Sequence, residues 1–271
     1  MRLARLIRMG RVRITLIEKL ESDLLQYIVD NHKQPGDRLA SLDMLSDTLG
    51  ISTGKLREQL EVARSLGLVE VKPRTGIRLA PYDFFPAVRL SLLYAVSQNP
   101  ALFESFSDLR DTVESDFFEA AVAKLTPDDL SHLQDLVERA WAKLQGEPSH
   151  IPHKEHRQLH MTLFSQLANP FVQGLLEAYW EAYEAVGYTQ LTEYEYLRTV
   201  WTYHENIVNA IIVGDIQKAH ELQDEHIKLR PHQHKVSQRP VPVPQVSNRA
   251  EREISRPREI QEQPMKAAIY P

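Results

Sequence analysis

Residues 35–76 read PGDRLASLDMLSDTLGISTGKLREQLEVARSLGLVEVKPRTG and contain the clearest structural signals of the chain. Ser41 and Ser52 are typical helix N-cap residues, and each precedes an apolar-periodic run that ends at a glycine, Gly50 or Gly67. A cap at the start and a glycine after the end are the expected boundaries of a helix. The two predicted helices span residues 42–49 and 52–66.

The residues on either side complete a small domain. Before the stretch, leucine or isoleucine recurs every four residues, which predicts one face of a helix that runs until Gln34-Pro-Gly-Asp37: Leu16, Leu20, Leu24 and Ile28. After the second helix, strands over 68–72 and 77–80 are joined by the turn Pro73-Arg-Thr-Gly76, where a glycine suits a positive φ. Three helices and a basic-tipped hairpin form a winged helix-turn-helix.

The remainder of the folded chain is predicted to be entirely helical. Three helix starts combine a polar cap with a proline at the first helical position: Asn99-Pro100, Thr126-Pro127 and Asn169-Pro170. The predicted helices span 84–97, 100–123, 126–145, 152–168, 170–188, 193–213 and 215–229. The expected fold class is therefore mainly α, with an N-terminal winged helix-turn-helix followed by an all-helical bundle of six or seven helices.

This reading divides the chain into five parts. The last part holds 7 of the 16 prolines and few large apolar residues, so it cannot bury enough surface to order itself and is predicted to be disordered. The predicted parts are a basic extension (1–15), the winged helix-turn-helix (16–80), a linker and first helix (81–99), a helical effector-binding and dimerisation domain (100–230) and the Pro-rich tail (231–271).

Composition excludes several classes of protein. The 271 residues are 42% hydrophobic and 25% charged, as in ordinary globular proteins, and the absence of cysteine excludes disulfides and Cys-based metal sites. No run of about 20 apolar residues and no signal-peptide pattern occur, so we expect a cytoplasmic protein without a membrane partner. The net charge is +4 over residues 1–80, −12 over 81–230 and +3 over 231–271. A basic first domain on an acidic second one indicates contact with nucleic acid.

The predicted helix that begins at Ser52 is the one that enters the major groove in a helix-turn-helix. Lys55 and Arg57 are the donors near its N-terminus, and Arg57 can read guanine or bind a phosphate. Hydroxyl groups and free backbone N–H groups at the same helix end suit a phosphate. The alternative is that these are ordinary solvated surface charges. The candidate DNA-binding residues are Arg38, Ser41, Ser52, Thr53, Lys55, Arg57, Arg74, Thr75 and Gly76.

Four histidines allow a geometric argument. His156 and His160 are four residues apart on one predicted helix and therefore share a face. His204 lies ten residues before Gly214 and His226 lies twelve after it, so in a helical hairpin both lie roughly 15–18 Å from the turn, side by side. Four converging imidazoles suit Zn, Ni or Cu. The alternative is that each histidine is a surface or hydrogen-bonded residue without metal.

Residues 16–80 resemble the winged helix of GntR-family transcription regulators. The matching blocks are Pro35-Gly-Asp-Arg-Leu39, Leu45 to Gly50, Ser52 with Leu56-Arg-Glu58 and Leu60, Gly67-Leu-Val-Glu-Val71 and Arg74-Thr-Gly76. The chain departs from the family in the groove-entering helix. The family usually has Ser-Arg followed by Thr or Pro, and an Ala-Leu pair after Arg-Glu, whereas Thr53, Gly54 and Lys55 follow Ser52 here and Gln59 precedes Leu60.

Residues 100–229 resemble the helical ligand-sensing FCD domain of the FadR subfamily of these regulators. The resemblance is carried by Leu109, Arg110 and Glu114, by His156-Arg-Gln-Leu-His160 before Asn169-Pro170, and by His204, Glu205, Gly214, Asp215 and His226. In many members an Asp and three His bind a metal that helps to hold a carboxylate effector. The resemblance implies that His160, His204 and His226 are ligands, with His156 in place of the Asp.

Arg110 is the candidate for binding the effector carboxylate, because its planar fork can hold one bidentately; the alternative is an intrahelical pair with Glu114. Several aromatic residues are expected in the core or at the rim rather than in ligand contact: Tyr179, Tyr183, Trp201 and Tyr203.

The sequence thus predicts a DNA-binding repressor, a homodimer on a palindromic operator, whose affinity for DNA is controlled by a small carboxylate near a His-rich zinc or nickel site. The alternative is a constitutive dimeric DNA-binding protein whose helical domain binds neither metal nor effector. An enzyme is not expected, since no His-Glu-x-x-His motif or placed general base is present.

Overall fold

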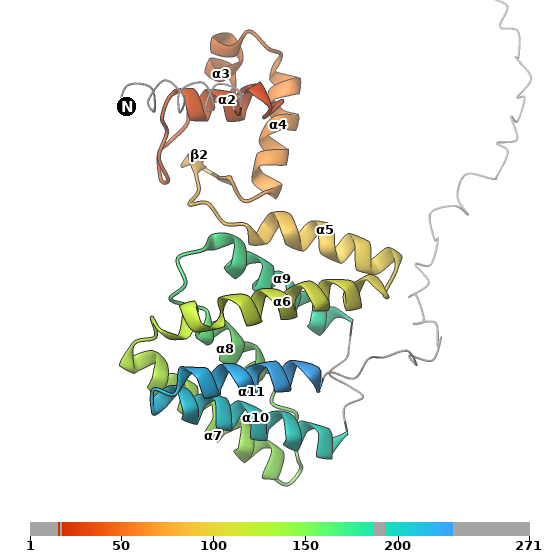
Figure 1. Cartoon of the computed structure of the whole chain (residues 1–271). Coiled ribbons are helices and arrows are strands. Elements are labelled where there is room, and N and C mark those ends of the chain that lie inside the picture. The colour runs from red at the N-terminus through yellow and green to blue at the C-terminus, as the bar shows by residue number, and fades with distance from the viewer. Residues whose placement is uncertain (1–15, 17, 187–192, 230–271) are drawn as a thin grey trace, which may run out of the picture. The chain divides into compact units, whose positions relative to one another are not determined.

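The computed structural model describes residues 16, 18–186 and 193–229 of the chain (Figure 1). The predicted basic extension and the Pro-rich tail lie outside the described residues. The protein is mainly helical and has one small antiparallel sheet. Its elements are α2 (Asp23–Asp30), α3 (Leu42–Leu49), α4 (Thr53–Ser65), β1 (Val69–Lys72), β2 (Gly76–Leu79), α5 (Phe85–Gln98), α6 (Leu102–Val122), α7 (Pro127–Gln145), α8 (His153–Leu163), α9 (Pro170–Ala185), α10 (Tyr194–Ile212) and α11 (Ile216–Lys228).

The first three helices and the two strands form the expected winged helix-turn-helix. Ser41 Oγ accepts a hydrogen bond from the Met44 backbone N–H at 3.4 Å, and Ser52 Oγ accepts one from Lys55 at 3.2 Å, so both serines cap their helices. Gly50 ends α3 in the left-handed conformation. The strands pair antiparallel from Val69↔Leu79 to Lys72↔Gly76, so the first is one residue shorter than predicted and the second begins and ends one residue earlier. A shared core holds these elements together, and it contains Leu24, Ile28, Leu39, Leu45, Leu56, Leu60, Ala63, Val69 and Ile77.

The prediction that one helix runs from Leu16 to Ile28 is wrong. The helix α2 begins at Asp23, and Ser22 Oγ caps it by accepting from the Leu25 backbone N–H at 3.3 Å. Glu21 has a φ of +50°, which interrupts a helix. Leu16 is accordingly 62% exposed, whereas Leu24 is fully buried. Leucine or isoleucine still recurs every four residues across the break, but only Leu24 and Ile28 are buried in the core.

The helices α5 to α11 pack as a bundle (Figure 1). Its largest core cluster joins α6 to α11 around Phe118, Leu136 and Trp201. The helices α10 and α11 form a hairpin at Gly214, whose φ is +81°, and α10 also packs along α7. Thr126 and Asn169 cap α7 and α9 as predicted, each with proline at the first helical turn.

Three predicted helix boundaries in the bundle are wrong, and one of them is the end of α9, which lies at Ala185 rather than 188. The helix α6 begins at Leu102, and Asn99 instead accepts from the Ala101 N–H through its side chain and from the Leu102 N–H through its carbonyl, which adds a turn before the helix. The helix α8 ends at Leu163 rather than 168. After Leu163 the chain forms two tight turns before the cap residue Asn169. In these turns the Ser165 backbone N–H donates to Thr162 O, and the Leu167 N–H donates to Phe164 O.

The contact between α5 and α9 depends on a glycine. A Cβ atom added at Gly174 would lie 2.5 Å from the Phe85 backbone nitrogen and 2.8 Å from the Phe84 carbonyl carbon. Backbone atoms cannot move aside as a flexible side chain can, so this close approach requires the absence of a side chain.

We expect Gly174→Ala to lower the free energy of unfolding by up to about 2 kcal/mol, because overpacking costs about 1–3 kcal/mol and the higher helix propensity of alanine offsets about 1 kcal/mol of it. The measurement is urea denaturation followed by circular dichroism. The matched control is Gly54→Ala in α4, where the nearest atom to the new Cβ is Ser52 Oγ at 3.8 Å. The control is expected to be neutral or stabilising, and equal effects of the two substitutions would contradict the prediction.

Candidate metal centre and effector pocket

Four histidines from three helices converge inside the bundle. One ring nitrogen from each of His156, His160, His204 and His226 lies within 4.8 Å of the others. The last three side chains are buried, and His156 is partly buried. The hairpin at Gly214 brings the rings of His204 and His226 to a centroid distance of 4.4 Å. The one-turn spacing on α8 brings His156 and His160 to 5.1 Å. The structure therefore brings together all four histidines singled out from the sequence.

The cluster has the protonation and the orientation of a ligand set. Burial lowers the pKa of His156, His160 and His204 well below the ordinary value and lowers that of His226 to about 3, so the four rings are neutral at pH 7. Neutral imidazoles keep the lone pairs that bind metals. The buried Nδ1 atoms of His204 and His226 have no hydrogen-bond partner among the described side chains. His204 Nε2 and His160 Nε2 face each other at 3.2 Å.

A buried carboxylate orients the cluster. Glu114 is fully buried on α6, and its Oε2 atom lies 3.1 Å from His160 Nδ1. The same oxygen accepts from Arg110 Nη2 at 2.8 Å and from Gln223 Nε2 at 3.1 Å. Burial raises the pKa of Glu114, and the Arg110 guanidinium opposes that rise. Arg110 Nη2 lies 2.9 Å from the same ring nitrogen, so His160 Nδ1 has both a donor and an acceptor as neighbours, and the ring is held with its Nε2 atom toward His204.

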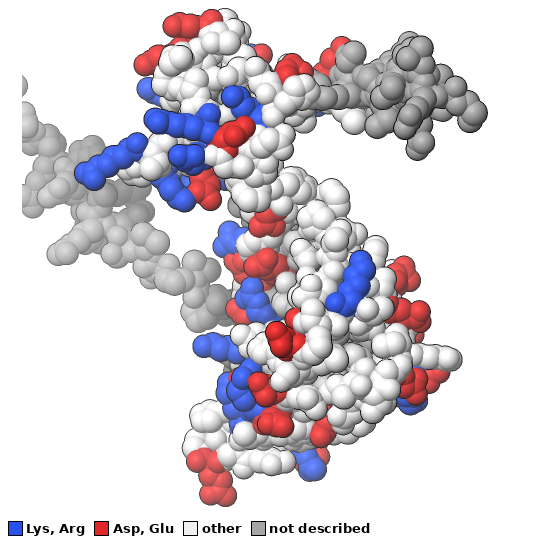
Figure 2. All heavy atoms as spheres, turned by 90° about the vertical axis from the view of Figure 1, so that its left-hand side faces the viewer, with Lys and Arg blue, Asp and Glu red and all other residues white. Residues whose placement is uncertain are grey.

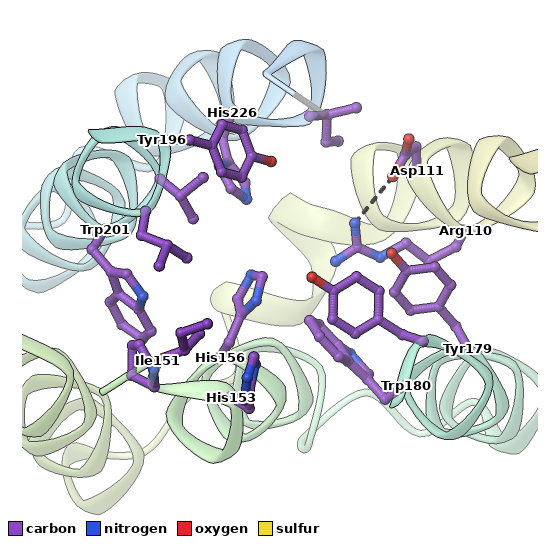
Figure 3. Close-up of a pocket in the computed structure, with 15 residues that line it drawn as sticks. Arg110, Asp111, Ile151, His153, His156, Tyr179, Trp180, Tyr196, Trp201 and His226 are labelled. Carbon is purple, nitrogen blue, oxygen red and sulfur yellow. Dashed lines mark hydrogen bonds and ion pairs between the residues drawn. The ribbon is translucent and has the colours of Figure 1, made fainter. Parts of the chain in front are cut away.

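A pocket of about 70 Å³ opens beside the histidines, between α6, α8, α9 and α10–α11 (Figure 3). His156 and His226 point into it from opposite sides, and the Arg110 guanidinium reaches it from a third (Figure 3). The remaining wall is largely aromatic and apolar, and it includes Ile151, Pro152, Tyr179, Trp180, Tyr183, Tyr196, Leu197, Val200 and Trp201. Tyr179, Tyr183 and Trp201, which were expected in the core or at the rim, line this pocket, and Tyr179 and Trp201 are also buried in the core.

Arg110 is already paired in this arrangement. Its Nη1 donates to Asp111 Oδ1 at 3.0 Å, and its Nη2 donates to Glu114. The guanidinium also lies over the ring of Tyr179, at 4.8 Å from the centroid. The intrahelical pair that was the alternative for Arg110 is therefore present, and the same side chain also borders the pocket.

The candidate DNA-binding residues lie on the winged helix-turn-helix, where Lys and Arg gather on one face (Figure 2). Arg57 is exposed on α4 and has no ion-pair partner among the described residues. Arg74 is exposed at the tip of the hairpin, beside Thr75, with a φ of +69°. Arg38 packs its guanidinium near Gly76, where an added Cβ would lie 3.3 Å from Nε. Lys55, the other expected donor of α4, forms an ion pair with Asp23 at 2.8 Å.

Sequence reasoning missed several residues of the site. Asp111, His153 and Tyr196 line the pocket without having been singled out. Gln223 lies three residues before His226, and this spacing places both on one face of α11, which was a usable signal. Tyr203, considered together with the other aromatic residues, donates to Glu225 Oε2 at 3.2 Å and does not line the pocket.

The comparisons with known proteins agree with this architecture. A model of the FCD domain family matches residues 92–229. The uncharacterized HTH-type transcriptional regulator YcbG of Bacillus subtilis (strain 168) is 24% identical over 217 residues, which cover 80% of this chain and 89% of that protein. The HTH-type transcriptional regulator LutR of the same organism is 25% identical over 209 residues, covering 74% and 92%.

The solved structure of Streptococcus agalactiae GntR shares the fold, with a TM-score of 0.57 and 19% identity over 79% of this chain and 97% of that one. None of the helices in the described part of the chain is long and apolar enough to cross a membrane. A winged helix-turn-helix joined to an FCD domain is thus present in both sequence and structure. The chain belongs to the GntR family of DNA-binding transcription regulators, in the group with an FCD domain, and is a regulator rather than an enzyme.

Proposed function

We propose that this regulator is a homodimeric repressor whose affinity for a palindromic operator is controlled by a small carboxylate bound beside a metal held by His156, His160, His204 and His226. The observation that carries the proposal is the convergence of four neutral imidazoles beside a pocket that His156, His226 and Arg110 border. A pocket with a few convergent polar groups and an otherwise apolar wall is the usual form of a small-molecule site.

The donor set fits a transition metal. Four nitrogen ligands without a carboxylate favour zinc or nickel over magnesium or calcium. The Nε2 atoms of His160 and His204 lie 3.2 Å apart, close enough for one ion to contact both. When bound, the metal supplies positive charge that attracts a carboxylate and polarises it. Glu114 contacts the ring of His160, and Gln223 donates a hydrogen bond to Glu114. The two side chains together hold that ring in place for this role.

Arg110 and the aromatic wall would select the effector. The guanidinium has five N–H groups, and one of them, at Nε, is buried without a hydrogen-bond partner among the described residues. Arg110 can therefore bind an effector carboxylate while it stays paired with Asp111 and Glu114. The Tyr and Trp rings would then surround the carbon skeleton of the effector. A small acid fits this pocket, because the walls enclose little volume.

Binding would act through a shift between two arrangements of the dimer. The pocket is built from α6, α8, α9, α10 and α11, so an effector that fits one arrangement of these helices better stabilises that arrangement. In a two-fold dimer, the spacing of the two recognition helices must match half-sites about one helical turn apart. A change in that spacing lowers operator affinity, and linkage requires that the operator in turn weakens effector binding.

We expect the purified, untagged protein to contain about one zinc or nickel per chain by elemental mass spectrometry, and His160→Ala to lose it. His132 is exposed on α7, outside the cluster, so His132→Ala is the matched control and keeps its metal. Less than about a tenth of an equivalent after both metals have been offered would reject the metal site and favour the constitutive alternative.

We expect a member of a panel of small carboxylates to change the affinity of the metal-loaded protein for a selected operator by about 5- to 150-fold, the usual range of allosteric coupling. The operator is first selected from random duplexes by the protein itself, and binding is measured by fluorescence anisotropy. Arg110→Lys removes the planar fork but keeps the charge, so it should weaken the response while leaving effector-free operator binding intact. An operator affinity that no acid, metal or chelator changes would contradict effector control but not DNA binding.

A further inference from the structure

A polar cluster outside the histidine site joins the recognition helix α4 to the N-terminus of α2. Lys55 Nζ lies 2.8 Å from Asp23 Oδ2. Gln59, one turn further along α4, donates from Nε2 to the same carboxylate oxygen at 2.7 Å. Its Oε1 accepts from the Leu24 backbone N–H at 3.0 Å and from Ser22 Oγ at 3.4 Å. The polar ends of Lys55 and Gln59 are therefore both directed toward α2.

Lys55 and Gln59 stand among the positions of α4 at which this chain departs from the family pattern, and they are four residues apart on one helix face. Asp23 contacts both of them, since one carboxylate oxygen receives the ammonium and the amide. These two donors hold the pKa of Asp23 below its ordinary value, so the carboxylate is charged at neutral pH. The charge of Lys55 is thus paired within the domain before DNA is present.

We propose that Asp23 is a positioning residue that withholds Lys55 from DNA phosphates and thereby lowers the sequence-independent part of DNA affinity. The proposal rests on the docking of α4 in the major groove. A lysine near the start of a recognition helix is a mobile cation within reach of the phosphate backbone. The Asp23 carboxylate neutralises that cation and would itself repel a phosphate that approached it.

The ion pair between Lys55 and Asp23 is accessible to solvent. Lys55 is 54% exposed and Asp23 is 35% exposed, so solvent and salt screen their attraction and the pair is not locked in the core. Arg57, exposed on the same helix without an ion-pair partner among the described residues, is left as the cation for contact with a base edge or phosphate. Of these two cations, Arg57 is under this proposal the residue that recognises DNA bases, while Lys55 adds little to the attraction of the domain for DNA phosphates.

The test measures the salt dependence of binding to a random-sequence duplex of about 30 base pairs. Each phosphate contact adds about 0.9 to the slope of log affinity against log salt concentration. Asp23→Asn keeps a hydrogen-bond acceptor for Gln59 but removes the charge, so we expect its slope to be steeper by about 0.9. Lys55→Met should change the wild-type slope by less than about a third of that amount, and should abolish the gain in the Asp23→Asn background. Asp30→Asn, the same change at the opposite end of α2, is the control and leaves the slope unaltered.

Two results would overturn the proposal. One is a slope of Asp23→Asn that equals the wild-type slope in a protein with an unchanged unfolding midpoint. The other is a loss of about 0.9 in slope for Lys55→Met alone, since Lys55 would then already contact a phosphate. If Asp23→Asn lowers the unfolding midpoint, the slope of Lys55→Met decides whether the proposal holds. That substitution leaves the hydrogen bond between Gln59 and Asp23 in place.

Arg57→Ala separates this proposal from the docking of α4 on which it rests. Loss of binding to the selected operator in Arg57→Ala, together with unchanged slopes in the other variants, refutes the role of Asp23 alone. Operator binding that no substitution in α4 alters refutes the docking of that helix.

Discussion

The helical domain depends on the contacts that one buried carboxylate, that of Glu114, makes with three helices. A carboxylate without water is costly unless its partners are in place, and Oε2 of Glu114 has partners on three helices: Arg110 on its own helix α6, His160 on α8 and Gln223 on α11. These contacts fix α8 and α11 relative to α6. The ring of His160, and with it the direction of its Nε2 atom toward His204, follows from the same constraint.

The same constraint determines how charge is distributed around the pocket. Arg110 lies between Asp111 and Glu114, so two carboxyl groups surround the one arginine that lines the pocket. The Arg110 guanidinium also lies over the rings of Tyr179 and Trp180, at 4.8 and 5.7 Å. The side chain is thereby held in one orientation at the cost of being largely neutralised. An anionic ligand would therefore depend on the charge that a metal adds at the histidines as well as on Arg110.

The sequence was most informative where local chemistry alone determines structure. Ser41, Ser52, Thr126 and Asn169 cap helices as expected, because a cap is a bond between a side chain and its own neighbouring backbone. The convergence of His204 and His226 could be predicted because the hairpin at Gly214 is local. The break at Glu21 was not predictable from the apolar period, since Leu16 and Leu20 continue the pattern in exposed positions. Pairings between distant helices, such as Lys55 with Asp23, have no local signal that names the partner.

His156 stands where the resemblance to FCD domains implies an aspartate, and the two side chains behave differently in a metal-free cluster. A carboxylate at this place would be a further buried negative group in a cluster that Glu114 already borders, and without metal it would have to be neutralised or paired. An imidazole can be buried neutral, and its ring here packs edge-on against Trp180 at 4.8 Å and lies 4.9 Å from His204. Four neutral rings are compatible with a packed bundle whether or not a metal is bound. A histidine at this place would therefore lessen the dependence of folding on a metal, and it would leave the full charge of a bound metal available to an anionic ligand.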